Sequence, residues 1–251
     1  MKQFNQIQAW LEERRTRGMR TLGFVPTMGN LHMGHISLIQ HSQKDNDDTL
    51  VSIFVNQAQF NTPEDYQNYP RTLEADLTYL KDANVTYCLL PNRDEIYSDD
   101  YRFQIHETTH HLKLEGKHRP GHFTGVLTVI MKLLNITQPT RLYLGEKDFE
   151  QLQYIKDMVA AFFMDVDVIG GPTLREESGL AYSSRNNRLS PAGRKKADAF
   201  AKCFLSAASL ENAREALSAF DVEYLEEDFQ RRFVVVNIEG VRLIDNVALS
   251  N

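Results

Sequence analysis

Histidine and glycine are concentrated in the segment PTMGNLHMGH, residues 26–35. Gly29 and Gly34 allow a ligand to approach the backbone closely. His32 and His35 are three residues apart, so at the start of a helix both imidazoles can point at one target. The N-terminus of such a helix also offers unpaired N–H groups to an anion. The segment therefore indicates a phosphate site.

Two further polar segments suit a nucleotide and a small polar substrate. SIFVNQAQF, residues 52–60, contains the neutral amides of Asn56 and Gln59, which can bind hydroxyl and carboxylate groups. LGEKD, residues 144–148, offers the Lys147 cation to a phosphate and the Asp148 carboxylate to ribose hydroxyls. Gln151 follows one helical turn beyond Lys147.

A fourth segment, residues 174–186, combines two hydroxyl groups and a guanidinium group at Ser183, Ser184 and Arg185. Taken alone, a short polar segment of this kind fits an ordinary turn or a solvated loop. Four such segments in order along one chain argue against that interpretation.

Apolar runs that alternate with helical patterns must position these segments. The predicted strands are 21–25, 50–55, 85–90, 141–144 and 166–169. The predicted helices are 4–17, 34–43, 73–82, 126–134 and 152–163. This alternation predicts an α/β fold, a Rossmann-like, doubly wound parallel sheet, in which ligands bind beyond the carboxyl ends of the strands.

The pattern changes after about residue 171. Ser190 and Pro191 form a helix start, and the helix is expected to run through Ala207. Short strands are then predicted at 222–225, 233–238 and 241–244, the last two joined by a turn at Glu239 and Gly240. We expect a nucleotide-binding domain at 1–171 and a small α+β lid domain at 172–251.

Composition restricts the partners and the setting. The 251 residues are 42% hydrophobic and 25% charged, as in globular proteins, and the chain has no apolar run long enough to span a membrane. A net charge of −6 argues against binding to nucleic acid. The N-terminus has no secretory pattern, and the two cysteines lie among apolar residues. We therefore expect a cytoplasmic protein without membrane or nucleic-acid partners.

The segment at residues 26–35 resembles the histidine-glycine-histidine signature of the nucleotidyl transferase superfamily. Together with SIFVNQAQF, YPRTLEADL, RPGHFTGV, LGEKDFEQL, GLAYSSRN and RLIDN, it makes the sequence similar to the pantothenate synthetase family. The resemblance implies an ATP-dependent ligase that joins (R)-pantoate to β-alanine through pantoyl adenylate and releases AMP and pyrophosphate. It also implies Mg²⁺ accompanying ATP and a homodimer.

The resemblance further implies roles for individual residues. The residues expected to bind ATP are Met28, Gly29, Asn30, Leu31, His32, Met33, Gly34, His35, Gly145, Glu146, Lys147, Asp148, Leu174, Tyr182, Ser183, Ser184 and Arg185. Those expected to be catalytic are His35, as a proton donor, with His32, Lys147 and Arg185. Gln59 is expected to contact pantoate and β-alanine, and Gln151 to bind pantoate.

Arg119 and His122 are expected to support the site from behind, and Asp76 is a candidate for assisting magnesium, whose ligands stay unassigned. The sequence departs from the family pattern at Gln57, where proline is common, at Glu150, where glutamine is usual, and at Tyr182, where an aliphatic residue or methionine is usual. The region from 224 to 251 is also shorter than expected.

Three other interpretations compete with this one. The chain could be another nucleotidyl transferase of the same superfamily, or a nucleotide-binding module without catalysis. The motif HETTH, residues 106–110, also matches the zinc-protease pattern, which requires both histidines on one helical face. Its two β-branched threonines and the preceding β-like run at 101–105 make a helix there unfavourable.

Overall fold

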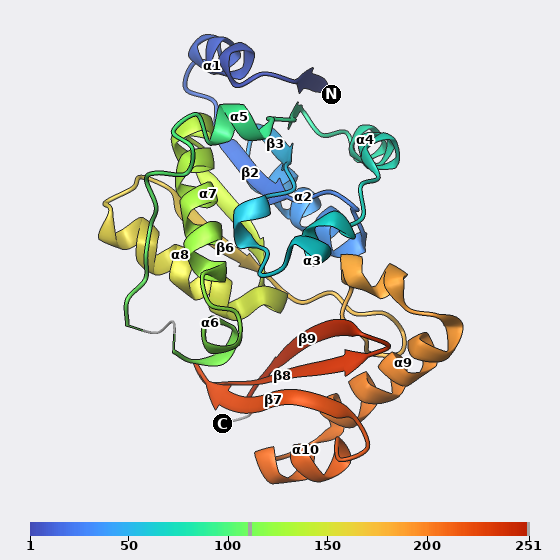
Figure 1. Cartoon of the computed structure of the whole chain (residues 1–251). Helices are drawn as coiled ribbons and strands as arrows, with labels where there is room; N and C mark the ends of the chain where they lie inside the picture. The colour runs from blue at the N-terminus through green and yellow to red at the C-terminus, as the bar shows by residue number, and fades with distance from the viewer. Residues whose placement is uncertain (110–111, 250–251) are drawn as a thin grey trace. The chain divides into compact units, whose positions relative to one another are not determined.

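The computed structural model describes residues 1–109 and 112–249 (Figure 1). Its contacts divide the chain into two units. The larger unit comprises Met1–Leu31, His35–Gly145 and Glu150–Gly171, and the smaller unit comprises His32–Gly34, Glu146–Phe149 and the chain from Pro172 onward. Both units are therefore assembled from separate stretches of sequence. Within the described ranges, no helix is both long and apolar enough to cross a membrane.

The larger unit is built on a six-stranded sheet in the order β1-β4-β3-β2-β5-β6, and every described pairing in it is parallel. Its strands are β1 (Lys2–Phe4), β2 (Leu22–Thr27), β3 (Asp48–Ile53), β4 (Tyr87–Leu89), β5 (Arg141–Gly145) and β6 (Asp167–Gly171). The predicted Rossmann-like sheet is confirmed. β2 lies between β3 and β5, so the order of strands reverses beside β2, where ligands of such sheets bind.

Helices connect and cover these strands. They are α1 (Ile7–Thr16), α2 (Met33–Asp45), α3 (Pro63–Gln67), α4 (Leu73–Asp82), α5 (Arg93–Ile96), α6 (Leu114–His118), α7 (His122–Thr137) and α8 (Phe149–Ala161), with short 3₁₀ helices η1 (Gln57–Gln59) and η2 (Glu146–Asp148). Leu38 of α2 and Leu80 of α4 share one core with Val25 and Val51 of the sheet. Because side chains alternate along a strand, Phe24 then points to the opposite face. Figure 1 shows α7 in front of the sheet.

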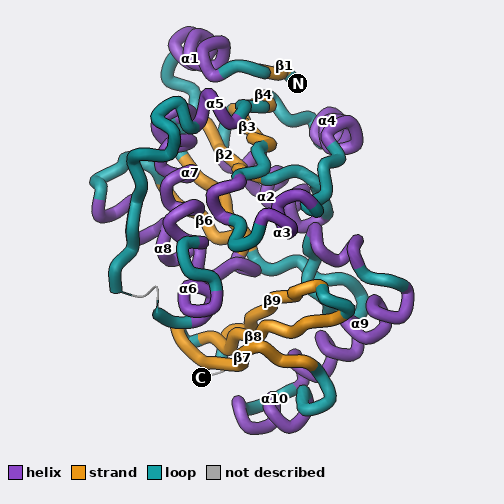
Figure 2. The backbone as a smooth tube through the Cα atoms, viewed as in Figure 1, coloured by secondary structure: helices purple, strands orange, loops and turns teal. Residues whose placement is uncertain are grey.

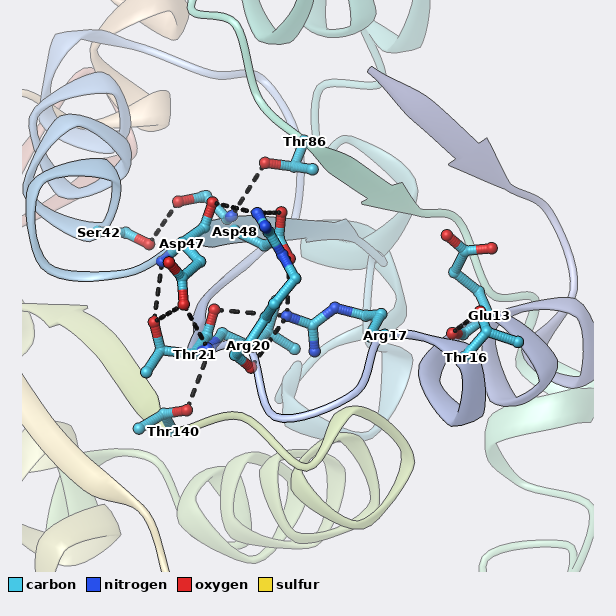
Figure 3. Close-up of polar contacts among 12 residues, drawn as sticks. Glu13, Thr16, Arg17, Arg20, Thr21, Ser42, Asp47, Asp48, Thr86 and Thr140 are labelled. Atoms are coloured by element: carbon cyan, nitrogen blue, oxygen red, sulfur yellow. Dashed lines mark hydrogen bonds and ion pairs between the residues drawn. The ribbon is translucent and has the colours of Figure 1, made fainter.

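The amino ends of β2 and β3 are held by polar contacts around the buried Asp48 carboxylate (Figure 3). Asp48 begins β3 and is 4% exposed. It accepts hydrogen bonds from Arg17 Nη2 at 2.9 Å and from Arg20 Nε at 2.9 Å and Nη2 at 3.0 Å. Thr21 and Asp47 bond each other beside it. Paired charges thus stabilise the amino ends of these strands. The candidate site lies at the opposite, carboxyl ends.

The smaller unit contains an antiparallel sheet in the order β7-β8-β9 (Figure 2). Its elements are η3 (Ser184–Arg188), α9 (Pro191–Ser206), α10 (Leu210–Ala216), β7 (Asp221–Asp228), β8 (Arg231–Ile238) and β9 (Val241–Ala248). The predicted start of α9 is confirmed, because the Ser190 hydroxyl accepts the Gly193 N–H at 3.1 Å. Phe200 and Phe204 of α9 pack against Val234 and Val236 of β8.

Several predicted elements differ from the structure. Residues 2–4 form strand β1 beside β4, whereas the sequence predicts a helix from residue 4. The β-like run at 101–105 forms no strand, and the expected helix 126–134 is the middle of the longer α7. The expected strand 222–225 is likewise part of the eight-residue β7. The expected turn is confirmed, with positive φ at Glu239 and Gly240, as tight hairpins require.

Candidate active site

The loop that follows β2 is shaped by a buried carboxylate. Asp76 of α4 is 2% exposed, and it accepts the N–H groups of Asn30 at 2.9 Å and Leu31 at 2.8 Å. The Thr72 hydroxyl donates to the same carboxylate at 3.1 Å. A Cβ atom on Gly29 would lie 3.0 Å from Asp76 Oδ2, and Gly29 has a φ of +79°. Asp76 therefore holds this loop, which is a different task from the magnesium role considered for it.

His35 follows in the first turn of α2 and is partly buried in the larger unit. The same unit contains the expected ATP residues Met28, Gly29, Asn30, Leu31 and Gly145, and the expected substrate residues Gln59 and Gln151. Gly145 ends β5, and β5 pairs with β2. The larger unit thus places the loop after β2 and the end of β5 on adjacent strands.

Gln59 lies in η1, and its side chain is held by Asn56. Asn56 Nδ2 donates to Gln59 Oε1 at 2.9 Å and to the Gly125 carbonyl at 3.2 Å. Asn56 Oδ1 accepts the Ala58 N–H at 3.4 Å and the Tyr97 hydroxyl at 2.6 Å. A Cβ atom on Gly125 would lie 2.4 Å from the Ala58 carbonyl oxygen. Glycine at this position therefore lets α7 approach η1 closely enough to complete the network.

Arg119 and His122 hold the backbone of Gln59. The His122 Nδ1 and Arg119 Nη2 atoms lie 2.8 Å and 3.2 Å from the Gln59 carbonyl oxygen. A carbonyl oxygen only accepts hydrogen bonds, so Nδ1 of His122 carries a proton and donates. Arg119 Nη1 then donates to His122 Nε2 at 3.1 Å. Both side chains support Gln59 from behind through its main chain.

Glu150, a departure from the family pattern, is 3% exposed at the start of α8. Its carboxylate accepts the Glu115 N–H at 2.9 Å and the Tyr154 hydroxyl at 2.8 Å. Burial raises its pKa to about 7, and the hydrogen bonds from Tyr154 and the backbone only partly oppose this. Near neutral pH the Glu150 carboxyl group is therefore ionised in only a fraction of the molecules. It faces α6 and Tyr154.

His32 belongs to the smaller unit, together with Lys147 and Tyr182. Its ring is stacked with Tyr182 at a centroid distance of 6.2 Å. Burial and the Lys147 cation lower its pKa to about 4, so its imidazole is neutral at physiological pH. A Cβ atom on Gly34 would lie 3.0 Å from that ring. Tyr182, another departure from the family pattern, thus forms part of the surroundings of His32.

Lys147 lies in η2, and this segment is fixed from β9. Asn246 is 1% exposed, and its Nδ2 donates to the carbonyl oxygens of Glu146 at 3.0 Å and Lys147 at 2.8 Å. The Lys147 Nζ atom lies 3.6 Å from Asp148 Oδ1. Glu146 Oε2 lies 3.7 Å from Arg231 Nη1. The RLIDN motif therefore serves to hold the backbone that presents Lys147.

The segment from 174 to 188 forms a loop closed by its own backbone. Tyr182 N donates to the Leu174 carbonyl at 3.1 Å, and Arg175 and Ala181 form an isolated bridge. The Ser183 hydroxyl accepts the Arg185 N–H at 3.3 Å and caps η3, which contains Ser184. Met33 also belongs to the smaller unit, and its side chain is exposed. The smaller unit thus contains the expected ATP residues that the larger unit lacks.

Sequence reasoning missed three supporting roles, although it had considered Asp76 for a different one. The loop-holding role of Asp76, the contact of Asn246 with the Lys147 segment, and the hydroxyl of Tyr97 behind Asn56 all depend on partners distant in sequence. Asp76 and Asn246 lie in the family motifs YPRTLEADL and RLIDN, whereas none of the quoted motifs contains Tyr97.

The zinc-protease interpretation has no support in the described residues. Residues 106–109 are not helical, and His106 Nδ1 lies 3.2 Å from the Thr124 hydroxyl. The second histidine of the motif, His110, lies outside the described residues. Among the residues that are described, no group of three or more histidine, cysteine, aspartate or glutamate side chains could hold a metal ion.

A Rossmann-like sheet with a glycine- and histidine-rich loop after β2 and a lysine segment after β5 defines a nucleotide-binding α/β enzyme. The family model described as pantoate-beta-alanine ligase matches residues 1–248. A pantothenate synthetase of Legionella pneumophila is 51% identical over 253 residues, which cover 99% of this chain and 100% of that protein. One of Bdellovibrio bacteriovorus is 47% identical, covering 98% and 97%.

Two solved structures of such ligases resemble this chain over nearly its whole length. The pantoate-beta-alanine ligase of Francisella tularensis, crystallised with beta-gamma ATP and β-alanine, has a TM-score of 0.95 and 40% identity over 99% of this chain and 97% of that one. The pantothenate synthetase of Thermus thermophilus has a TM-score of 0.93 and 35% identity, covering 100% of both chains. The chain belongs to the pantoate–β-alanine ligase family and is therefore an ATP-dependent ligase of pantothenate biosynthesis.

Proposed function

We propose that this ligase joins (R)-pantoate to β-alanine in two steps through pantoyl adenylate. A carboxylate oxygen of pantoate attacks the α-phosphorus of ATP, and the bond to the β-phosphate oxygen breaks to release pyrophosphate. The amine of β-alanine then attacks the acyl carbon, AMP leaves with the carboxylate oxygen, and the nitrogen loses a proton to give the amide. Adenylation is required because a free carboxylate has no good leaving group.

The observation that supports this proposal best is the presence of two different kinds of polar group among the expected site residues. His32 and Lys147 lie together in the smaller unit, where a cation and a neutral imidazole suit phosphate groups. Gln59 and Gln151 in the larger unit are neutral amides, which suit a small hydroxy acid better than a phosphate-bearing acceptor. This favours the ligase over a nucleotidyl transferase that modifies a phosphorylated acceptor.

The residues that bind ATP in this proposal are those that the family resemblance implies. They are Met28 to Leu31, His35 and Gly145 of the larger unit, and His32 to Gly34, Glu146 to Asp148, Leu174 and Tyr182 to Arg185 of the smaller unit. Gln59 contacts pantoate and β-alanine, and Gln151 contacts pantoate.

Four side chains assist the chemistry. Lys147 and Arg185 balance the negative charge that develops on the departing pyrophosphate. His35 donates a proton or a hydrogen bond to the same phosphates. His32 contributes as a neutral imidazole, because its pKa of about 4 leaves it uncharged at physiological pH. No side chain forms a covalent intermediate.

Magnesium enters as part of the substrate complex with ATP. The described residues contain no cluster of three or more side chains suited to a metal ion, and the Asp76 carboxylate already accepts two backbone N–H groups. These residues fit an ion held mainly by phosphate oxygens and water rather than by a protein cage. A cytoplasmic location fits the two free cysteines, Cys88 and Cys203, and a homodimer is the expected assembly.

Oxygen labelling tests the intermediate directly. The enzyme is incubated with Mg-ATP, β-alanine and pantoate that carries ¹⁸O in its carboxylate, and the products are analysed by mass spectrometry. We expect pantothenate and AMP, with one ¹⁸O atom in the AMP phosphate. Label in inorganic phosphate together with ADP would instead mean attack on the γ-phosphorus. ATP turnover without formation of the amide would mean that β-alanine is not the amine acceptor.

A further inference from the structure

The amide of Asn56 has only one orientation that satisfies its fixed neighbours. The Ala58 N–H can only donate, so the atom facing it at 3.4 Å is the oxygen Oδ1. The Gly125 carbonyl can only accept, so the atom facing it at 3.2 Å is the nitrogen Nδ2. The second hydrogen of Nδ2 then reaches Gln59 Oε1 at 2.9 Å. The backbone on two sides thus defines which end of Asn56 meets Gln59.

Tyr97 makes the shortest of these contacts. Its hydroxyl donates to Asn56 Oδ1 at 2.6 Å, and the residue is 4% exposed. Burial raises the pKa of the Tyr97 hydroxyl, so it keeps its proton and remains a donor. The ring is held by edge contact with Tyr101 at 5.1 Å and by the Lys132 ammonium group 5.4 Å from its centroid. Tyr97 is therefore a fixed donor behind Asn56.

We propose that Tyr97 is a positioning residue, which acts through Asn56 to make the Gln59 amide a hydrogen-bond donor toward substrate. Gln59 Oε1 accepts from Asn56, so Nε2 is the end of the amide that remains to meet a ligand. The group it meets must be an acceptor, such as a carboxylate or hydroxyl oxygen of pantoate. This inference rests on the proposed function, which assigns Gln59 to the substrate.

Replacing Tyr97 with phenylalanine removes the donor and leaves the ring in place. Asn56 then loses its shortest hydrogen bond and is held only by the Ala58 N–H at 3.4 Å and the Gly125 carbonyl at 3.2 Å, so it positions the Gln59 amide less firmly. We expect the dissociation constant and the KM for pantoate to rise about tenfold, as for a lost buried hydrogen bond. The KM for ATP should stay unchanged. Tyr101→Phe is the matched control, because its hydroxyl bonds Thr128 rather than Asn56.

A double-mutant cycle separates positioning from a general structural effect. Pantoate binding is measured by calorimetry for wild type, Tyr97→Phe, Gln59→Ala and the double variant, with thermal unfolding as a check on folding. If Tyr97 acts through Gln59, its substitution has no further effect once Gln59 is alanine. Equal effects in both backgrounds, or an equal loss in Tyr101→Phe, would overturn the inference.

Asn56→Asp provides a second variant if Tyr97→Phe does not fold. Its carboxylate can accept from Tyr97 and Ala58 but cannot donate to Gln59, so the Gln59 amide should turn and present its oxygen. We again expect weaker pantoate binding that depends on Gln59, and a Gln59-independent effect would contradict this. Absence of pantothenate from the wild-type enzyme would overturn the proposed function and this inference together, whereas normal product with an additive cycle overturns the inference alone.

Discussion

His32 and His35 are three residues apart, yet the structure gives them different surroundings. His32 lies against Tyr182, and burial together with the nearby Lys147 cation lowers its pKa to about 4. His35 lies in the larger unit at the start of α2. From their spacing alone the two histidines are equivalent, but their environments in the structure differ. His32 is a neutral group, so in the proposed mechanism the positive charge comes from Lys147 and Arg185.

Substitution of His35 with alanine should slow adenylation. Removing one group that stabilises transition-state charge lowers turnover by about 10² to 10³. The measurement is pantoate-dependent release of pyrophosphate, with thermal unfolding followed in parallel. His41→Ala is the matched control, because His41 lies on the same helix and its side chain is 41% exposed. A His35→Ala enzyme as fast as wild type would remove His35 from the mechanism.

Glu150 should make stability depend on pH. Its pKa is about 7 in the folded protein and 4.5 in its ordinary state, so between these values the folded chain binds a proton that the unfolded chain has lost. The stabilising contribution is complete below pH 4.5 and is lost as pH rises through 7. Glu150→Gln should therefore raise the free energy of unfolding at pH 8 by on the order of 2 kcal/mol, with little gain at pH 4.5.

Urea unfolding at the two pH values measures this difference. Glu74→Gln on the exposed face of α4 is the control and should change neither value. If Glu150→Gln raised the free energy of unfolding equally at both pH values, the cause would be better packing and not the removal of a buried charge.

The loop between β2 and α2 depends on an element far away in sequence. Asp76 of α4 uses one oxygen for the Asn30 N–H and the other for the Leu31 N–H. In Asp76→Asn only one acceptor oxygen remains, so one buried N–H loses its partner, which costs about 1–3 kcal/mol. We expect a lower thermal midpoint and a KM for ATP raised about tenfold.

Asp82→Asn on the same helix is the control, because Asp82 is exposed at its C-terminal end. An Asp76→Asn enzyme that binds ATP as well as wild type would mean that the loop keeps its shape without the carboxylate.

The sequence allowed the alternation of strands and helices, and hence the parallel sheet, to be predicted because apolar runs directly report buried strands. Strand β1 was missed because its three residues, Lys2–Phe4, carry no alternation and become a strand only by pairing with β4. The run at 101–105 has strand-like residues but pairs with none of the strands in the described part of the chain. Local pattern predicts an element well only where the element does not depend on a distant partner.

The candidate site shows the same difference between what local sequence reveals and what depends on distant partners. The residues expected to meet ligands could be named from motifs, because chemistry restricts their types and spacing. Among the residues that hold them, Arg119 and His122 could also be named from a motif. The supporting roles of Asp76, Asn246 and Tyr97 could not, since these residues act through hydrogen bonds across 45, 99 and 41 positions of sequence. The low pKa of His32 was equally hidden, because burial is a property of the folded chain.

At the scale of the whole molecule, the assembly is a further prediction. The larger unit leaves apolar side chains such as Phe103 and Phe163 exposed at 66% and 94%. The homodimer proposed above would bury any such side chain that lies in its interface. We expect sedimentation at micromolar concentration to give twice the chain mass of 28.9 kDa. A single-chain mass at that concentration would rule out the homodimer.

The smaller unit takes His32–Gly34 and Glu146–Phe149 from the first part of the chain and completes itself with β9. During synthesis at roughly 5 to 20 residues per second, Lys147 leaves the ribosome roughly 5 to 20 s before Asn246, which lies 99 residues later. The nascent chain can form its parallel sheet in that interval, but the carbonyl groups of the Lys147 segment must wait for their partner. The segment that we propose to bind the triphosphate therefore gains its last backbone contacts only after β9 has been synthesised.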